Sequence, residues 1–172
     1  MVRPLWEAGA LLALTIMGTI TTAGAEPLKI EMTLSNPQQL RIDFPLVGAE
    51  KHTGIYVKRE GVAAPGSTWA GAKVQEVGLH DIFPDRVWGT GYITFTLPNG
   101  DQVSMKHEFV ASFLPTPDGR MAPVDHGFWE IIGGTGGLAG IRGVGRFQFK
   151  PAPSDANARV WDLAGDIAVV RR

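Results

Sequence analysis

Apolar and polar residues alternate along several stretches of the chain after residue 25. In 28–34, leucine, isoleucine and methionine are separated by lysine, glutamate and threonine, and 40–44 repeats the pattern with Leu40, Ile42 and Phe44. In 74–83, one face carries Val77, Leu79 and Phe83, and the opposite face carries Glu76, Gly78 and His80. A period of two is typical of a strand with one face against a core. These segments are therefore predicted to be strands.

The segments 88–97 and 102–114 are predicted to form a hairpin, because Asn99-Gly100 between them tolerates the positive φ angles of tight turns. In the second arm one face is almost wholly apolar, and we expect this face to point into the core. Its members are Val103, Met105, His107, Phe109, Ala111 and Phe113.

Further strands are predicted at 127–132, 146–150 and 161–169, with proline-rich loops at 115–123 and 151–158. After residue 25, no stretch longer than about ten residues shows the 3.6-residue period of an amphipathic helix. Short strands between turns indicate an all-β fold, which is either a single antiparallel closed β-barrel of roughly eight strands or a β-sandwich. We favour the barrel.

The glycine-rich segment after 127–132 carries the most specific motif of the chain. It contains Gly133-Gly134-Thr135-Gly136, then Leu138, Gly140 and Gly143, before the next strand. This pattern resembles the hallmark of the allene oxide cyclase and dirigent superfamily. The resemblance implies an eight-stranded calycin-like barrel, in proteins that cyclise an unstable fatty-acid epoxide or steer radical coupling. It assigns no catalytic residue here.

The same glycines loosely match a dinucleotide-binding fingerprint, but Gly140, Gly143 and Gly145 would disfavour the helix that such a site needs. We therefore expect a structural turn and no cofactor. Cysteine is absent, and the four histidines have no close metal-ligand spacing, so no metal site is expected either.

The N-terminus has the layout of a cleavable export signal. Arg3 precedes an apolar run over 8–20, and Ala23-Gly24-Ala25 forms a cleavage site of the A-x-A type. We expect 1–25 to be a signal peptide, 26–172 to be the β-barrel domain, and the protein to be periplasmic or secreted. No stable membrane span is expected after cleavage. The formal charge of −1, without a basic stripe, disfavours nucleic acid as a partner.

Two residues are candidates for catalysis. His107 lies on the apolar row of 102–114, where an imidazole can act as an acid, a base or a hydrogen-bond donor. It can equally be a core histidine with a satisfied hydrogen bond. Glu130 precedes the glycine turn; if it points inward, burial would raise its pKa and suit it to proton transfer, and if outward it is a solvated carboxylate.

Five further residues are candidates for lining an interior cavity, because flat or flexible apolar side chains suit an apolar ligand. They are Trp88, Tyr92, Met105, Phe109 and Trp129. Three functions stay open: a barrel that binds a small hydrophobic molecule in its interior, a cyclase or isomerase that uses the same cavity, and a non-catalytic interaction or assembly barrel that allows homo-oligomers. Whether the chain is an enzyme is not decided by its sequence.

Overall fold

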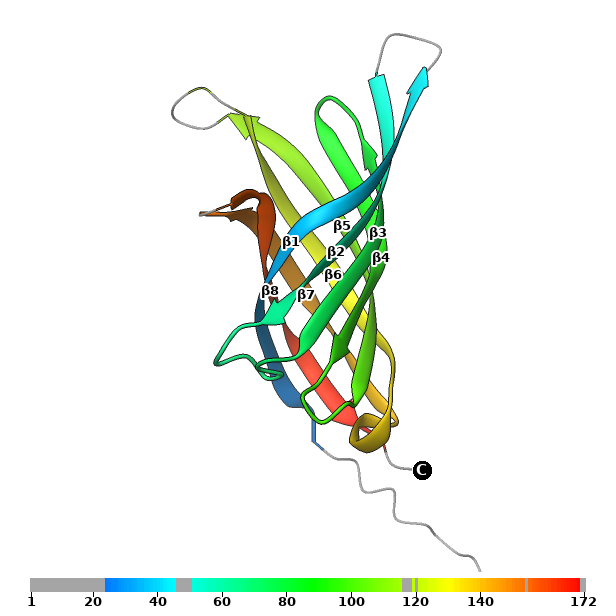
Figure 1. Ribbon diagram of the computed structural model, residues 1–172, viewed down its shortest axis with the longest axis vertical. Coiled ribbons are helices and arrows are strands. Elements are labelled where there is room, and N and C mark those ends of the chain that lie inside the picture. The colour runs from blue at the N-terminus through cyan, green and yellow to red at the C-terminus, as the bar shows by residue number, and fades with distance from the viewer. Residues whose placement is uncertain (1–23, 46–50, 116–118, 120, 154, 171–172) are drawn as a thin grey trace, which may run out of the picture.

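The computed structural model describes residues 24–45, 51–115, 119, 121–153 and 155–170. Eight antiparallel strands follow one another around a closed barrel, and β8 pairs with β1 (Figure 1). The strands are β1 Glu26–Pro45, β2 Lys51–Ala63, β3 Lys73–Ile82, β4 Arg86–Thr96, β5 Gln102–Pro115, β6 Met121–Gly134, β7 Ile141–Ala152 and β8 Asp155–Val169. The predicted barrel is confirmed, and the sandwich alternative is wrong.

Several strand boundaries differ from those predicted. The two early strands are one long β1, and β2 is a strand that the alternation did not reveal. The expected loop at 151–158 is largely strand, because β7 extends to Ala152 and β8 begins at Asp155. The glycine-rich connection between β6 and β7 holds a single 3-10 turn, Gly136–Leu138, with positive φ at Gly136 and Gly140. It is the structural turn that we expected.

The lower end of the barrel in Figure 1, where β1 begins and β8 ends, is filled by apolar side chains. Trp69, in the connection between β2 and β3, is buried there and packs edge-on against Phe95 at 5.1 Å between ring centroids. Fully buried side chains of this end also include Leu28, Ile30, Met32, Ile93, Met105, Ile131 and Ile141. Burial of this apolar surface is the main source of stability in a chain without disulfides.

An irregularity in β1 reverses which side chains face inward. Between Ser35 and Gln38 the register with β2 shifts, so that two residues of β1 lie opposite one residue of β2. Beyond this bulge, Arg41 lies opposite the buried Ile55, whereas Leu40 and Ile42 are exposed on the outer wall. The alternation in 40–44 therefore predicted a strand correctly, but Leu40 and Ile42 do not face the core, because one extra residue exchanges the two faces.

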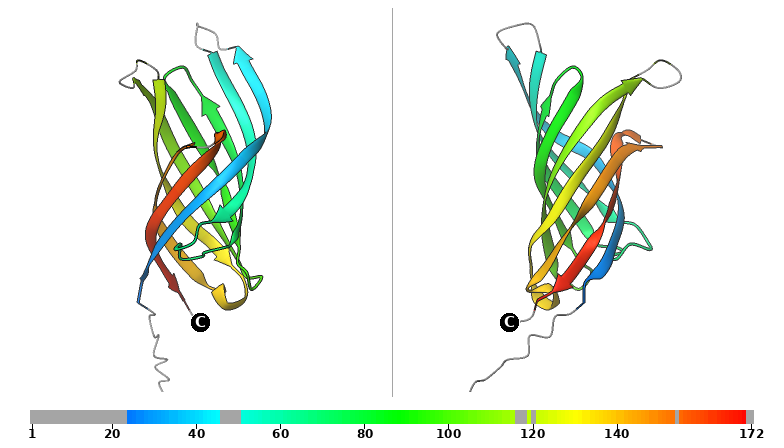
Figure 2. Two further views of the ribbon diagram at one scale, coloured as in Figure 1. Left: turned by 60° about the vertical axis from the view of Figure 1, so that its left-hand side comes forward. Right: turned by 180° about the vertical axis from the view of Figure 1, so that it is seen from behind.

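The upper part of β1 also separates from β8, as Figure 2 shows from two sides. Pairing between the two strands ends at Leu34 and Arg159. The barrel is thus closed in its lower part and widens toward its upper end.

Within the described segments, no helix is long and apolar enough to cross a membrane. The predicted signal peptide, 1–25, lies almost entirely outside the described residues and stays a prediction.

Candidate functional site

Four polar side chains meet inside the barrel above the apolar lower end. Arg59 comes from β2, Glu76 and His80 from β3, and His107 from β5. Glu76 is fully buried, His107 is 1% exposed, and Arg59 and His80 are each 9% exposed. We call these four residues the central cluster. Charged and polar groups at this depth are rare unless they are paired or functional, which makes the cluster the strongest candidate for a site.

The carboxylate of Glu76 is the centre of the cluster. Arg59 Nη1 donates a hydrogen bond to Glu76 Oε2 over 2.8 Å, directly across the β2–β3 ladder. The other oxygen, Oε1, lies 3.7 Å from His107 Nε2 and 3.9 Å from His80 Nε2. Two imidazoles and one guanidinium therefore surround a single buried carboxylate.

The electrostatics keep Glu76 ionised and His80 neutral. Burial alone would raise the pKa of Glu76, but His107 and Arg59 outweigh burial and hold that pKa below its usual value. Burial, together with the charge of Arg59, lowers the pKa of His80 to about 4, although Glu76 opposes this change. At neutral pH the His80 imidazole therefore has one donor nitrogen and one acceptor nitrogen.

Several polar atoms of the cluster have no hydrogen-bond partner among the described residues. They are Glu76 Oε1, His80 Nε2, Arg59 Nε and both ring nitrogens of His107. A buried polar atom without a partner costs about 1–3 kcal/mol. The cluster thus offers donors and acceptors to a polar group that enters the barrel.

Aromatic rings border the cluster on one side. His80 meets the Phe109 ring edge-on at 5.0 Å, and His107 meets Trp161 edge-on at 5.5 Å. Phe147, Phe149 and Trp161 stack with interplanar angles of 14° to 27°. The site therefore combines a polar centre with a flat apolar wall.

Glycines on β3 and β4, beside these side chains, give them their space. A Cβ at Gly91 would lie 2.7 Å from His107 Nε2, and one at Gly89 would lie 2.0 Å from the Phe109 ring. A Cβ at Gly78 would lie 2.6 Å from Glu76 Oε1. Glycine at these strand positions permits the close approach.

Asp125 is a second buried carboxylate, on β6 near the upper end. Among the residues that the structure describes, β6 and β7 pair through their main chains only between Gly127–Glu130 and Val144–Phe147. Above this ladder, Asp125 Oδ1 accepts a hydrogen bond from the Phe149 N–H over 2.7 Å and so links the two strands. Burial raises the pKa of Asp125 to about 6, against opposing effects of Phe149, His126 and Arg159.

Replacing Asp125 with asparagine is expected to stabilise the protein above pH 6 and to have little effect near pH 4. The folded-state pKa of Asp125, about 6, lies above the ordinary value of 3.8, so the folded state holds the proton more tightly and stability falls as pH rises between these values. Asparagine has no charge to bury, and its amide oxygen still accepts the Phe149 N–H. Urea unfolding at about pH 4 and about pH 8 measures the difference. An equal effect at both pH values would contradict the assignment.

The structure places the predicted site residues on both faces of the wall. His107, Met105 and Phe109 are buried inside the barrel, as the predicted inward row of 102–114 required, and Trp129 is buried there too. Met105 and Trp129 lie in the packed core, whereas His107 and Phe109 belong to the site and its border. Their functional roles stay predictions.

The expectation that Trp88 and Tyr92 line the interior is wrong, and of the two alternatives for Glu130 the structure shows the outward one. Trp88 and Tyr92 are about half exposed on the outer wall, and Glu130 is exposed as well. On β4 the inward positions at this height are Gly89 and Gly91, which the Phe109 and His107 rings cover from inside. The neighbouring Trp88 and Tyr92 must therefore point outward.

Sequence reasoning missed Glu76 and Arg59. Glu76 shares its strand face with Gly78 and His80, which has the composition of a solvated face, and Arg59 lies on a strand that was not predicted. One signal was available: alternate glycines at Gly89 and Gly91 indicate a close approach by large side chains inside the barrel.

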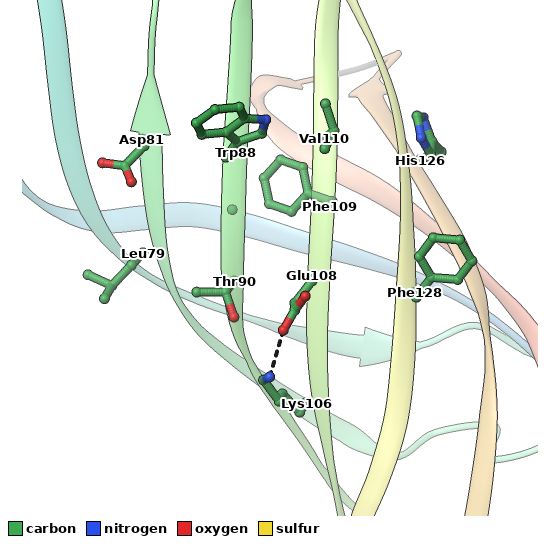
Figure 3. Close-up of a pocket in the computed structure, with 11 residues that line it drawn as sticks. Leu79, Asp81, Trp88, Thr90, Lys106, Glu108, Phe109, Val110, His126 and Phe128 are labelled. Carbon is green, nitrogen blue, oxygen red and sulfur yellow. Dashed lines mark hydrogen bonds and ion pairs between the residues drawn. The ribbon is translucent and has the colours of Figure 1, made fainter.

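A shallow depression of about 670 Å³ runs over the outer wall of β3–β6 (Figure 3). Leu79, Trp88, Val110 and Phe128 are its exposed apolar residues, and the Lys106–Glu108 ion pair lies among them. A second outer depression, of about 660 Å³, crosses β6, β7, β8 and β1. Among the described residues, no group of three or more histidine, cysteine, aspartate or glutamate side chains is arranged to hold a metal ion.

The fold and the site together define a small antiparallel barrel with an ion-pair cluster in its interior. No protein-family model matches the chain, and no curated protein matches it either. Among solved structures, two pterocarpan synthase dirigent proteins are similar to it. The first is 12% identical with a TM-score of 0.49, and the match covers 95% of this chain and 98% of that protein. The second is 11% identical with a TM-score of 0.48, and the match covers 88% of this chain and 99% of that protein.

A conserved protein of unknown function from Rhodopseudomonas palustris is also similar, with 13% identity, a TM-score of 0.46 and coverage of 84% of this chain and 99% of its own. The closed barrel of eight consecutive antiparallel strands confirms the eight-stranded barrel that the resemblance of the glycine motif implies. Similarities at this level carry no conclusion about activity.

Proposed function

We propose that the protein is an exported barrel that binds a small, mostly apolar molecule carrying at least one hydrogen-bonding oxygen. The observation behind the proposal is the set of unpartnered, buried polar atoms in the central cluster. A ligand oxygen that meets His80 and Arg59 would satisfy His80 Nε2 and Arg59 Nε, and the apolar remainder would lie against the neighbouring rings.

The burial pattern favours the upper end of the barrel as the route by which a ligand reaches the cluster. Below the cluster, the interior is filled by apolar side chains, several of which have no exposed surface. Above it, Arg41 and Asp43 follow the inward-facing register of β1 and yet keep more than half of their side-chain surface exposed. His80 and Arg59 keep slightly more exposure than Glu76 and His107, and we assign them the ligand contact.

Replacing His80 with leucine is expected to weaken ligand binding about tenfold, the effect of losing one hydrogen bond of about 1.4 kcal/mol. The ligand is first sought by native mass spectrometry of protein isolated from its own cells. A fluorescent fatty-acid analogue and an anilinonaphthalene sulfonate dye then serve as probes in titrations of the wild type and the variant.

Trp88→Ala is the matched control, because Trp88 lies on the outer wall. The proposal fails if no small molecule accompanies the protein and neither probe binds. It also fails if Trp88→Ala weakens binding while His80→Leu does not, since the ligand would then occupy the outer depression.

A second function, proton transfer in a cyclase or isomerase, is favoured by one specific observation. Glu76 is an ionised buried carboxylate with an imidazole nitrogen 3.7 Å away, which is the arrangement of a base next to a donor. Glu76→Gln would then abolish turnover of a discovered ligand and retain its binding. Unchanged turnover would remove Glu76 from the mechanism, and a wild type that turns over no ligand would leave the barrel a binding protein.

A further inference from the structure

The upper half of β1 is paired along one edge only. Residues Gln38–Pro45 lie opposite Lys58–Lys51 of β2, whereas pairing with β8 stops at Leu34. In the described part of the chain, no strand covers the other edge of this segment, and Figure 2 shows it standing away from β8. The N–H and C=O groups along such an edge can pair with a further strand.

The side chains of this edge segment alternate between charge and apolar surface. Arg41 and Asp43 lie on the inward-facing side, 3.0 Å apart, and the Thr53 hydroxyl also donates to Asp43. Leu40 and Ile42 lie on the outer side and are 62% and 50% exposed. The segment therefore presents one basic and one acidic residue on one face, and exposed apolar residues on the other.

This pattern is self-complementary in one antiparallel register. If two copies of the segment pair with Ile42 opposite Ile42, Arg41 of each copy lies opposite Asp43 of the other. A register centred on Arg41 or Asp43 would place like charges opposite each other, which destabilises a strand pair. A register displaced by one residue would put Arg41 opposite Ile42 and mix the charged and apolar faces.

We propose that the protein forms a two-fold symmetric dimer in which the β1 edges of two copies pair antiparallel about Ile42. A two-fold axis at Ile42 makes the contact isologous and closed, so that it ends at two copies and does not extend into a filament. Exposed Leu40 and Ile42 then lie in one continuous outer sheet face shared by the two barrels. The dimer is independent of ligand binding inside the barrel.

The test is the mass in solution of protein isolated from its own cells, by sedimentation velocity over a range of concentrations. The wild type is expected to be a dimer that dissociates on dilution. Arg41→Asp places two acidic residues opposite each other at both ends of the register, and Asp43→Arg places two basic residues there. Each single variant is expected to be a monomer, with the far-UV circular dichroism of the wild type.

An equimolar mixture of the two single variants is expected to form a heterodimer, because each acidic edge then meets a basic edge. Val144→Lys is the control, since Val144 is exposed on β7, away from this edge. A wild type that is monomeric at every concentration would overturn the proposal. So would a dimer that Arg41→Asp leaves intact, or a mixture that fails to associate.

Phe128→Lys separates edge pairing from association through the outer wall of β3–β6. If Phe128→Lys dissociates the dimer and the two charge variants do not, the outer wall is the interface and the edge is not.

Discussion

Replacing Glu76 with leucine is expected to lower the free energy of unfolding by about 3–5 kcal/mol, the range for removing one partner of a buried ion pair. The substitution leaves the guanidinium of Arg59, which is nine-tenths buried, without the carboxylate that it contacts at 2.8 Å. It also removes the negative charge that the two imidazoles face. Urea denaturation at neutral pH measures the loss.

The double variant Arg59→Leu/Glu76→Leu is the informative comparison. With both charges removed, no uncompensated ion remains in the interior, and we expect most of the stability lost by Glu76→Leu to return. Glu130→Leu is the matched control, because Glu130 is exposed on the outer wall and should change stability by no more than about 0.5 kcal/mol. A cost for Glu76→Leu no larger than that for Glu130→Leu would show that Glu76 is not buried against Arg59.

This pair also shows why the fold could be predicted from the sequence more fully than the site. Period two and the Asn99-Gly100 turn define the β4–β5 hairpin locally, and its inward row was therefore predicted correctly, His107 included. The pairing of Arg59 with Glu76 depends on the register between β2 and β3, which is set by the closure of the whole barrel. No local pattern contains that information.

The faces of individual strands were harder to predict than the strands themselves. On β3, hydrophobicity favours the face with Leu79, yet Leu79 is exposed and Glu76 is buried. In a narrow barrel the inner face must also fit the large side chains of the same and neighbouring strands, and small or polar residues can be selected there. Gly78, Gly89 and Gly91 therefore indicate the inward face of their strands more reliably than the apolar residues between them.

The bulge in β1 also made the inward face of 40–44 hard to predict from the sequence. An extra residue between Ser35 and Gln38 changes the parity of every later position in the strand. Leu40 and Ile42 therefore continue the apolar alternation of 28–34 in the sequence but leave the core in space. The same change places Arg41 and Asp43 toward the upper opening of the barrel, where charge can be solvated.

Replacing Trp129 with alanine is expected to cost about 3–5 kcal/mol of unfolding free energy, as for other large-to-small changes in a packed core. The Trp129 indole is 2% exposed, and its Nε1–H donates to the Arg146 carbonyl over 3.1 Å. Its ring covers Gly145 and Gly165, where an added Cβ would lie 2.4 and 2.5 Å from the indole carbon Cζ2. Because these two residues have no side chains, neighbouring atoms cannot fill the space that alanine leaves.

Trp88→Ala is the control. Comparing it with Trp129→Ala tests which tryptophan faces the interior of the barrel and which faces the outer wall. Trp88 is about half exposed, and its main partners are Phe83 at 5.5 Å and the Arg86 guanidinium at 5.3 Å, both near the upper rim. Its removal exposes little that was buried, and we expect a cost below about 1 kcal/mol. Equal costs for Trp129→Ala and Trp88→Ala in urea unfolding would contradict the assignment of one tryptophan to the interior and the other to the outer wall. They would also contradict the register of β4, β5 and β6, which turns His107 toward the central cluster.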